Sequence, residues 1–131
     1  MNEFNWEFFE DGPPSATASS VHVTINTRCM IFFNRQAHAA LGSPEGVSLM
    51  YDPRRSTIGV IPTPLNRRST YKLRAKDGRR MASGCMISAK NFCKRFEILP
   101  QESLAFTDAE INNDGILILD LNKVRSVEKR R

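Results

Sequence analysis

Apolar and polar positions alternate in short stretches along most of the chain, a pattern typical of half-buried β-strands. The first two stretches, residues 21–25 and 29–33, are separated by a short polar turn. Two such stretches joined by a turn predict a β-hairpin. A second hairpin is predicted for residues 47–51 and 56–62, because Pro53 lies where type I turns favour proline.

The spacing changes to that of a helix between these two hairpins. Ala37, Ala40 and Leu41 recur at i, i+3 and i+4, which places them on one face of a short helix. Asn34 is a good N-cap for this helix, and Gly42 is a typical residue to end it. The first half of the chain is therefore predicted to have the order ββαββ.

The second half follows the same order after a stiff connector at residues 62–66, which contains two prolines. Asp77-Gly78 is a strong hairpin signal. Ser88 is the expected N-cap of a helix whose apolar face repeats at helical spacing. The elements predicted for this half are strands at residues 69–76 and 81–87, a helix after Ser88, and strands at 104–111 and 116–121.

The tripeptide Cys-Met-Ile occurs twice, at residues 29–31 and 85–87, each time directly before a predicted helix. The shared order of elements predicts an internal duplication. One unit has too little apolar surface to fold alone, so we expect two units to share one core. The predicted fold class is α+β, a β-rich small barrel or saddle built from two ββαββ pseudo-repeats, residues 21–62 and 67–122. The predicted organisation is a flexible N-terminal extension at 1–20, a single domain at 21–122 and a basic C-terminal tail at 123–131.

A length of 131 residues suits one domain. The longest unbroken apolar run has five residues, Cys29–Phe33, against the roughly 20 that a membrane-spanning helix needs. The N-terminus carries four acidic residues and no basic one, the reverse of a secretory signal peptide. The three cysteines form no C-x-x-C pair and suit reduced, buried thiols. We therefore expect a cytoplasmic protein without a membrane partner, either a monomer or a homodimer.

Positive charge is concentrated in the middle of the chain. Residues 54–95 carry twelve Lys or Arg against Asp77 alone, whereas residues 96–122 carry six acidic side chains and no Lys or Arg. Such an excess can attract a polyanion. The alternative is that these cations are solvated or neutralised by the acidic segment within the fold. Eleven of these twelve, all but Lys76, are candidate nucleic-acid-binding residues together with Arg28 and Arg35. The full set is Arg28, Arg35, Arg54, Arg55, Arg67, Arg68, Lys72, Arg74, Arg79, Arg80, Lys90, Lys94 and Arg95.

The hairpin VTINTRCMIFF, the helix NRQAHAALG and the hairpin VSLMYDPRRSTIGVIP resemble the swapped-hairpin domains of AbrB, MazE and MraZ-type bacterial proteins. The resemblance covers residues 21–62, and residues 70–121 more loosely. It implies interleaved hairpins in a small barrel and DNA binding through Arg28 in the first hairpin turn and Arg35 at the helix start. The chain departs from the family pattern at Thr27-Arg28 and Phe33-Asn34. A more distant likeness is to duplicated α+β DNA-binding domains with a saddle-shaped sheet.

Catalytic chemistry is not expected. His22 and His38 show no spacing that pairs them with a cysteine, and neither a metal-ligand pattern nor a phosphate-binding loop is present. We expect no enzyme activity and no cofactor. The first functional hypothesis is a transcription-regulator-like module that binds DNA or another polyanion. The alternative is a non-catalytic interaction or assembly module, of antitoxin or adaptor type, which contacts a protein partner through the aromatic N-terminal extension or the acidic final hairpin. A purely structural domain remains a third interpretation.

Overall fold

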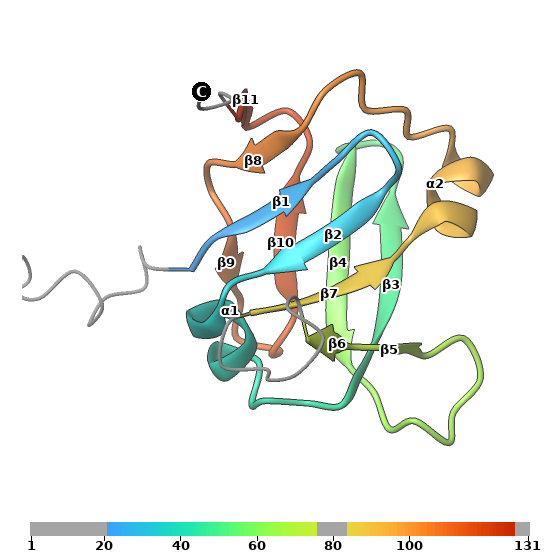
Figure 1. The fold of residues 1–131 in the computed structure, drawn as a ribbon, viewed down its shortest axis with the longest axis vertical. Helices are drawn as coiled ribbons and strands as arrows, with labels where there is room; N and C mark the ends of the chain where they lie inside the picture. The colour runs from blue at the N-terminus through green and yellow to red at the C-terminus, as the bar shows by residue number, and fades with distance from the viewer. Residues whose placement is uncertain (1–20, 76–83, 128–131) are drawn as a thin grey trace, which may run out of the picture.

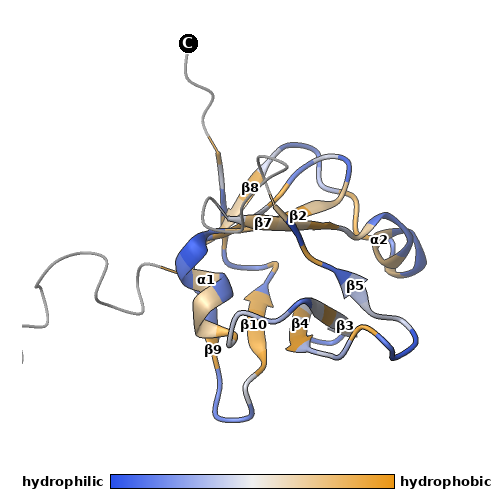
Figure 2. Ribbon diagram, turned by 60° about the horizontal axis from the view of Figure 1, so that its bottom comes forward, coloured by the Kyte–Doolittle hydropathy of each residue, from blue (hydrophilic) through white to orange (hydrophobic). Residues whose placement is uncertain are grey.

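The computed structural model describes residues 21–75 and 84–127 and shows two antiparallel β-sheets packed face to face (Figure 1). Two short helices, α1 and α2, lie on opposite sides of the sandwich (Figure 2). The fold is therefore β-rich with few helices, as the sequence predicts. The described strands form two separate sheets, and they do not close into the predicted barrel.

Sheet A joins the first hairpin of the first half to strands of the second half. Its strand order is β11-β8-β1-β2-β7-β6, in which β2 and β7 are neighbours and Ile31 pairs with Ile87. The bounds are β1 Val23–Ile25, β2 Met30–Phe33, β6 Arg74–Ala75, β7 Cys85–Ser88, β8 Leu104–Phe106 and β11 Val124–Ser126.

Sheet B joins the second hairpin of the first half, β3–β4, to the last hairpin of the second half, β9–β10. Its order is β5-β3-β4-β10-β9, in which β4 pairs with β10. The bounds are β3 Gly46–Asp52, β4 Thr57–Pro62, β5 Tyr71–Lys72, β9 Glu110–Ile111 and β10 Leu117–Asp120. The helices are α1 Arg35–Ala40 and α2 Lys90–Phe96.

The core lies between the sheets and consists of the inward-facing residues of each strand. Alternate residues of β2 and of β7 are buried, which is the period-two pattern of a sheet with one covered face. The largest fully buried side chains come from both sheets and from the crossing between them: Val23, Ile25, Ile31, Phe33, Val47, Ile58, Val60, Leu73, Cys85, Ile87, Leu117 and Leu119.

Two single strands predicted from the sequence are each divided between the sheets. Within the predicted strand at residues 69–76, the described residues form β5 in sheet B and β6 in sheet A, with Leu73, only 2% exposed, at the crossing. The backbone N–H of Leu73 donates to the Glu45 carbonyl oxygen at 3.0 Å, which fixes this crossing. Residues 104–111 likewise form β8 in sheet A and β9 in sheet B. Alternation predicted extended backbone correctly, but it could not show that the chain changes sheet.

The two helix starts differ from each other. The predicted N-cap of α1 is confirmed, because the Asn34 side chain accepts a hydrogen bond from the Ala37 backbone N–H at 2.8 Å. Ser88 is not the N-cap of α2, because it belongs to β7 and pairs with Met30. The N-cap position is held by Ala89, without a side-chain hydrogen bond.

The sequence predicts a basic tail at residues 123–131, but part of this segment forms a strand, β11. β11 pairs with β8, where Val124 lies opposite Phe106. The predicted hairpin turn around Asp77-Gly78 and the N-terminal extension at residues 1–20 lie outside the described residues.

Candidate nucleic-acid interface

Helix α2 presents a basic face to solvent. Phe92 and Cys93 are buried, while Lys90, Lys94 and Arg95 are exposed. A helix of seven residues is too short to be stable alone, so tertiary packing must hold it. Tyr51 of β3 supplies that packing, with its ring centroid 6.2 Å from that of Phe92 and 4.9 Å from that of Phe96.

The β1–β2 turn lies directly against α2 and brings Arg28 to it. The Ala89 backbone N–H, at the start of α2, donates to the Cys29 carbonyl oxygen at 2.9 Å. Beyond the helix, the Ile98 carbonyl oxygen accepts a 3.7 Å hydrogen bond from the Cys29 thiol. The turn is shaped by Asn26, whose Oδ1 accepts from the backbone N–H groups of Arg28 and Met30 at 2.9 and 3.0 Å. Cys29, the chain neighbour of Arg28, therefore contacts the backbone before and after the helix.

The β3–β4 turn continues from Tyr51 and carries two more arginines. Asp52 Oδ1 accepts a hydrogen bond from the Arg54 backbone N–H at 3.0 Å, which fixes the turn. The Arg55 guanidinium lies 4.0 Å from Asp52 Oδ2, whereas the exposed Arg54 makes no such pair with a described residue. Arg54 thus extends the cationic surface that begins on α2.

We call the surface formed by these cations the basic edge. Within residues 21–75 and 84–127, the ion pairs are Arg55 with Asp52 and Lys123 with Asp108. None of the cations in the basic edge is therefore neutralised by a described carboxylate within 4.0 Å. The basic edge consists of Arg28, Arg54, Lys90, Lys94 and Arg95.

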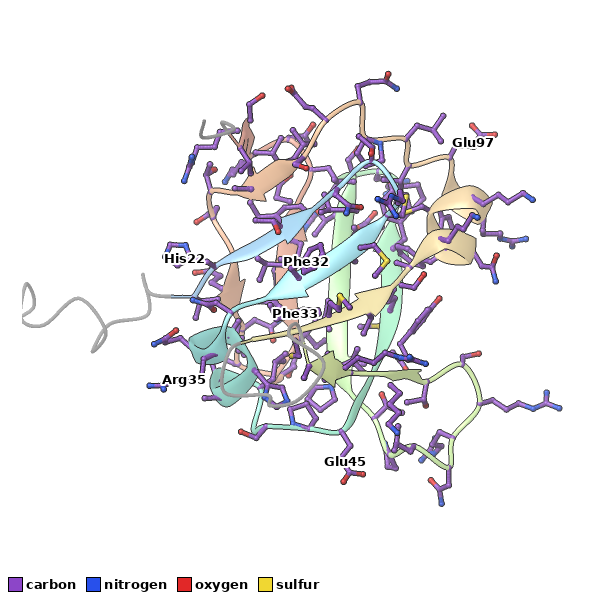
Figure 3. All side chains as sticks on the ribbon, in the orientation of Figure 1. His22, Phe32, Phe33, Arg35, Glu45 and Glu97 are labelled. Atoms are coloured by element: carbon purple, nitrogen blue, oxygen red, sulfur yellow. The ribbon has the colours of Figure 1, made fainter. Side chains whose placement is uncertain are left out.

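The remaining candidate residues do not all join this surface. Arg67, Arg68 and Lys72 are exposed on the loop after β4 and on β5, in the lower right of Figure 1. Arg35 is on α1, on the other side of the molecule from α2 (Figure 3). Arg74 is exposed on β6, and Arg79 and Arg80 lie outside the described residues.

Arg28 and Arg35, the two positions implied by the family resemblance, lie at opposite ends of β2. A strand of four residues spans about 13 Å, so these arginines are well apart. A DNA contact surface centred on α2 would therefore include Arg28 but not Arg35.

A second charged surface, of opposite sign, lies on the outer face of sheet B. It is a groove of about 690 Å³, which we call the acidic groove. Met50, Gly59, Ile116 and Ile118 line its floor. Its carboxylates are Asp52, Asp108, Glu110 and Asp120. The strand register shows that β3 and β4 complete this groove beside the final hairpin, because β4 pairs with both β3 and β10.

Lys123 lies among these carboxylates. Its ammonium group contacts Asp108 Oδ2 at 3.2 Å. The pKa of Lys123 is raised by its hydrogen bond and charge interaction with Asp108, and further by the charges of Asp120 and Glu110. Lys123 was not a candidate residue, because sequence alone placed it in a tail rather than beside the final hairpin.

The thiols and histidines show no catalytic arrangement in the described chain. Burial raises the pKa of the Cys85 thiol to about 11 and raises that of Cys93 as well, where a hydrogen bond with Cys29 adds to the effect. Cys85 and Cys93 therefore stay protonated at neutral pH, where only a thiolate is a strong nucleophile. His38 is buried and its Nε2 hydrogen-bonds the Pro44 carbonyl oxygen at 2.8 Å. Among the residues that the structure describes, no three His, Cys, Asp or Glu side chains could together hold a metal ion.

Comparison with known proteins adds no relative. No family model, curated protein or solved structure matches the chain. In the described part of the chain, neither helix has the length and apolar character needed to span a membrane. The function must therefore be inferred from the residues of this chain alone.

Proposed function

We propose that this protein is a nucleic-acid-binding, transcription-regulator-like module that contacts the phosphates of duplex DNA through the basic edge. One observation carries the proposal: Arg28, Arg54 and the three cations of α2 are exposed and have no carboxylate within ion-pair distance among the described residues. Cations that already had partners would gain little from binding a phosphate. These five keep their full charge for a polyanion.

The supporting geometry is a protruding helix between two turns. α2 lies at the right margin of the molecule, outside the two sheets (Figure 1). Side chains from α2 can therefore approach a ligand without a clash between that ligand and the sandwich. Seven residues make a helix about 10 Å long, which is short enough to lie across a DNA backbone.

We also propose that the two halves are a duplicated ββαββ unit related to the swapped-hairpin domains. The supporting observations are that Ile31 of one Cys-Met-Ile segment pairs with Ile87 of the other, and that β4 and β10 are neighbours in the second sheet. Under this proposal α1 and α2 are equivalent helices, and only α2 has kept a basic face.

The test is a fluorescence-anisotropy titration with a labelled duplex between about 50 and 200 mM salt. Five phosphate contacts predict a slope of about −4.5 in log K against log salt. Removing two contacts with Lys90→Ala and Lys94→Ala should make the slope about 2 units less steep. The matched control is Arg35→Ala with Arg74→Ala, which removes two exposed cations outside the basic edge and should leave the slope unchanged.

Two results would overturn the proposal. The first is the absence of binding at the lowest salt concentration. The second is an equal change of slope in both double variants, because the cations would then act through net charge and not through a defined surface.

A further inference from the structure

We infer that the acidic groove is a self-association site that receives the loop at residues 63–70 of a second copy of this chain. This inference does not depend on the proposed function, because neither surface belongs to the basic edge. It rests on the shape of the groove, on the complementary character of the loop and on their positions at opposite ends of one hairpin.

The floor of the groove is built by strand register. Met50, Gly59, Ile118 and Glu110 are consecutive cross-strand partners over β3, β4, β10 and β9. Met50, Gly59 and Ile118 form an apolar row that Glu110 ends. A Cβ atom at Gly59 would lie 3.2 Å from Met50 Cε and 3.3 Å from Ile116 Cγ2, so these two side chains pack closely over the glycine and form the apolar floor.

The rim of the groove is acidic at one end. Asp52, Thr57 and Asp120 form the next cross-strand row, directly beside the turn of the β3–β4 hairpin. Arg55 pairs with Asp52 and Lys123 pairs with Asp108. These pairs leave Glu110 and Asp120 without an ion pair among the described residues. A guest with an apolar side chain and neighbouring cations fits this surface.

The loop at residues 63–70 has that composition. Leu65 is 42% exposed, and Arg67 and Arg68 are exposed beside it. The loop contains no acidic residue. It projects from the lower right of the molecule in Figure 1, where a second copy could reach it.

Hydrogen bonds hold this loop in one shape before it binds. The Pro64 carbonyl oxygen accepts from the Arg67 backbone N–H at 3.1 Å and from Thr70 Oγ1 at 3.2 Å. Ser48 Oγ donates to the Ser69 carbonyl oxygen at 3.3 Å and ties the loop to β3. A loop that is already ordered loses little conformational entropy when it binds.

The loop cannot enter the groove of its own chain. It follows Pro62, which pairs with Val47 at one end of the β3–β4 hairpin, whereas Asp52 and Thr57 pair at the other end. Five residues of strand separate these ends, a distance of about 17 Å. The contact must therefore join two copies, either reciprocally about a two-fold axis or head to tail in a ring or an open chain.

The association should be weak. A stable interface buries about 1,200–2,000 Å² in total, more than one loop of this length can cover. We therefore expect a concentration-dependent increase in sedimentation coefficient between about 10 μM and 1 mM. The protein must be treated with nuclease beforehand, so that nucleic acid cannot bridge the copies.

A charge-exchange experiment tests the contact. The loop variant carries Arg67→Glu and Arg68→Glu, and the groove variant carries Asp108→Arg and Glu110→Arg; all four positions are exposed. Each variant alone should be monomeric, because its loop and groove now have the same sign. An equimolar mixture should associate again, because each loop then meets a groove of opposite charge. Arg35→Glu with Arg74→Glu is the control and should associate as the unaltered protein does. Circular dichroism of each variant verifies that it is folded.

The inference is overturned if the unaltered protein stays monomeric at about 1 mM. It is also overturned if either charge-reversed variant still associates, or if the mixture does not. Loss of association after nuclease treatment would likewise overturn it, while leaving DNA binding through the basic edge untouched. DNA binding without self-association would refute this inference alone, and self-association without DNA binding would refute the proposed function alone.

Discussion

Helices α1 and α2 follow neighbouring strands of one sheet, yet they are stabilised in different ways. α1 begins with the Asn34 side-chain cap and is followed by Gly42 at a φ of +92°, a conformation that glycine adopts without strain. α2 has no side-chain cap, and Glu97 at its end takes a left-handed φ of 58°. The aromatic contacts of Phe92 and Phe96 with Tyr51 hold α2 in place instead.

This difference shows where the proposed binding surface gets its shape. Local signals in the sequence determine α1, which carries the single cation Arg35. Tertiary packing determines α2, which carries three cations. The basic edge should therefore be sensitive to changes in the core beneath it, whereas α1 should not.

Phe92→Ala should have the largest effect. The substitution removes a buried ring and its contact with Tyr51, and should lower the free energy of unfolding by about 3–5 kcal/mol. Urea denaturation followed by circular dichroism measures the change. Ala37→Ser, at a buried position of α1, is a useful comparison that keeps the Asn34 cap. A cost for Phe92→Ala no larger than that for Ala37→Ser would contradict the view that packing holds α2.

Alkaline pH should destabilise the fold through its buried thiols. The pKa of Cys85 is raised to about 11 in the folded state. The unfolded chain therefore loses this proton first, so the stabilising contribution is complete below about pH 9, the ordinary thiol pKa, and is lost as pH rises towards 11. The loss should reach about 2–3 kcal/mol. Cys93, within α2, contributes in the same direction. Cys85→Ala should make the decline above pH 9 less steep in denaturation series, and an unchanged decline would count against burial as its cause.

Removal of the α1 cap should have an intermediate effect. Asn34→Ala removes the acceptor for the Ala37 N–H and should cost about 1 kcal/mol. Ser88→Ala is the matched change before α2 and should cost less than about 0.5 kcal/mol, because Ser88 caps nothing. Thermal melts of both variants measure the difference. Equal costs would mean that the two helix starts do not differ as described.

Glu97→Gly should have the smallest effect and the opposite sign. Glycine occupies the left-handed region without the steric cost that Glu97 pays, so the variant should gain up to about 1 kcal/mol in stability. The exchange also removes a carboxylate next to the basic edge, so DNA should bind more tightly at low salt. Glu45→Gly, another exposed glutamate labelled in Figure 3, is the control and should provide neither gain. A loss of stability at position 97 would contradict this prediction.

The sequence predicted the elements better than their arrangement. Asn34, Gly42 and the alternation in residues 21–33 and 47–62 are local signals, and the structure has the corresponding helix and hairpins. The change of sheet at Leu73 is not a local property, since both sides of it are extended backbone. β11 was missed because a strand of three residues with mixed polarity resembles a tail.

The sequence likewise predicted the cations of the candidate surface but not how they are grouped. The charge count identified the cations, but their grouping depends on contacts between distant segments, such as Ala89 with Cys29 and Tyr51 with Phe96. The acidic groove depends on the cross-strand register of Gly59 with Met50 and Ile118. Neither relationship is visible in the order of residues along the chain.

The crossing at Leu73 has a mechanical consequence. Residues 71–75 are a strand of sheet B and then a strand of sheet A. They therefore tie the two sheets together, and the sheets cannot separate without breaking the strand pairing on one side of Leu73.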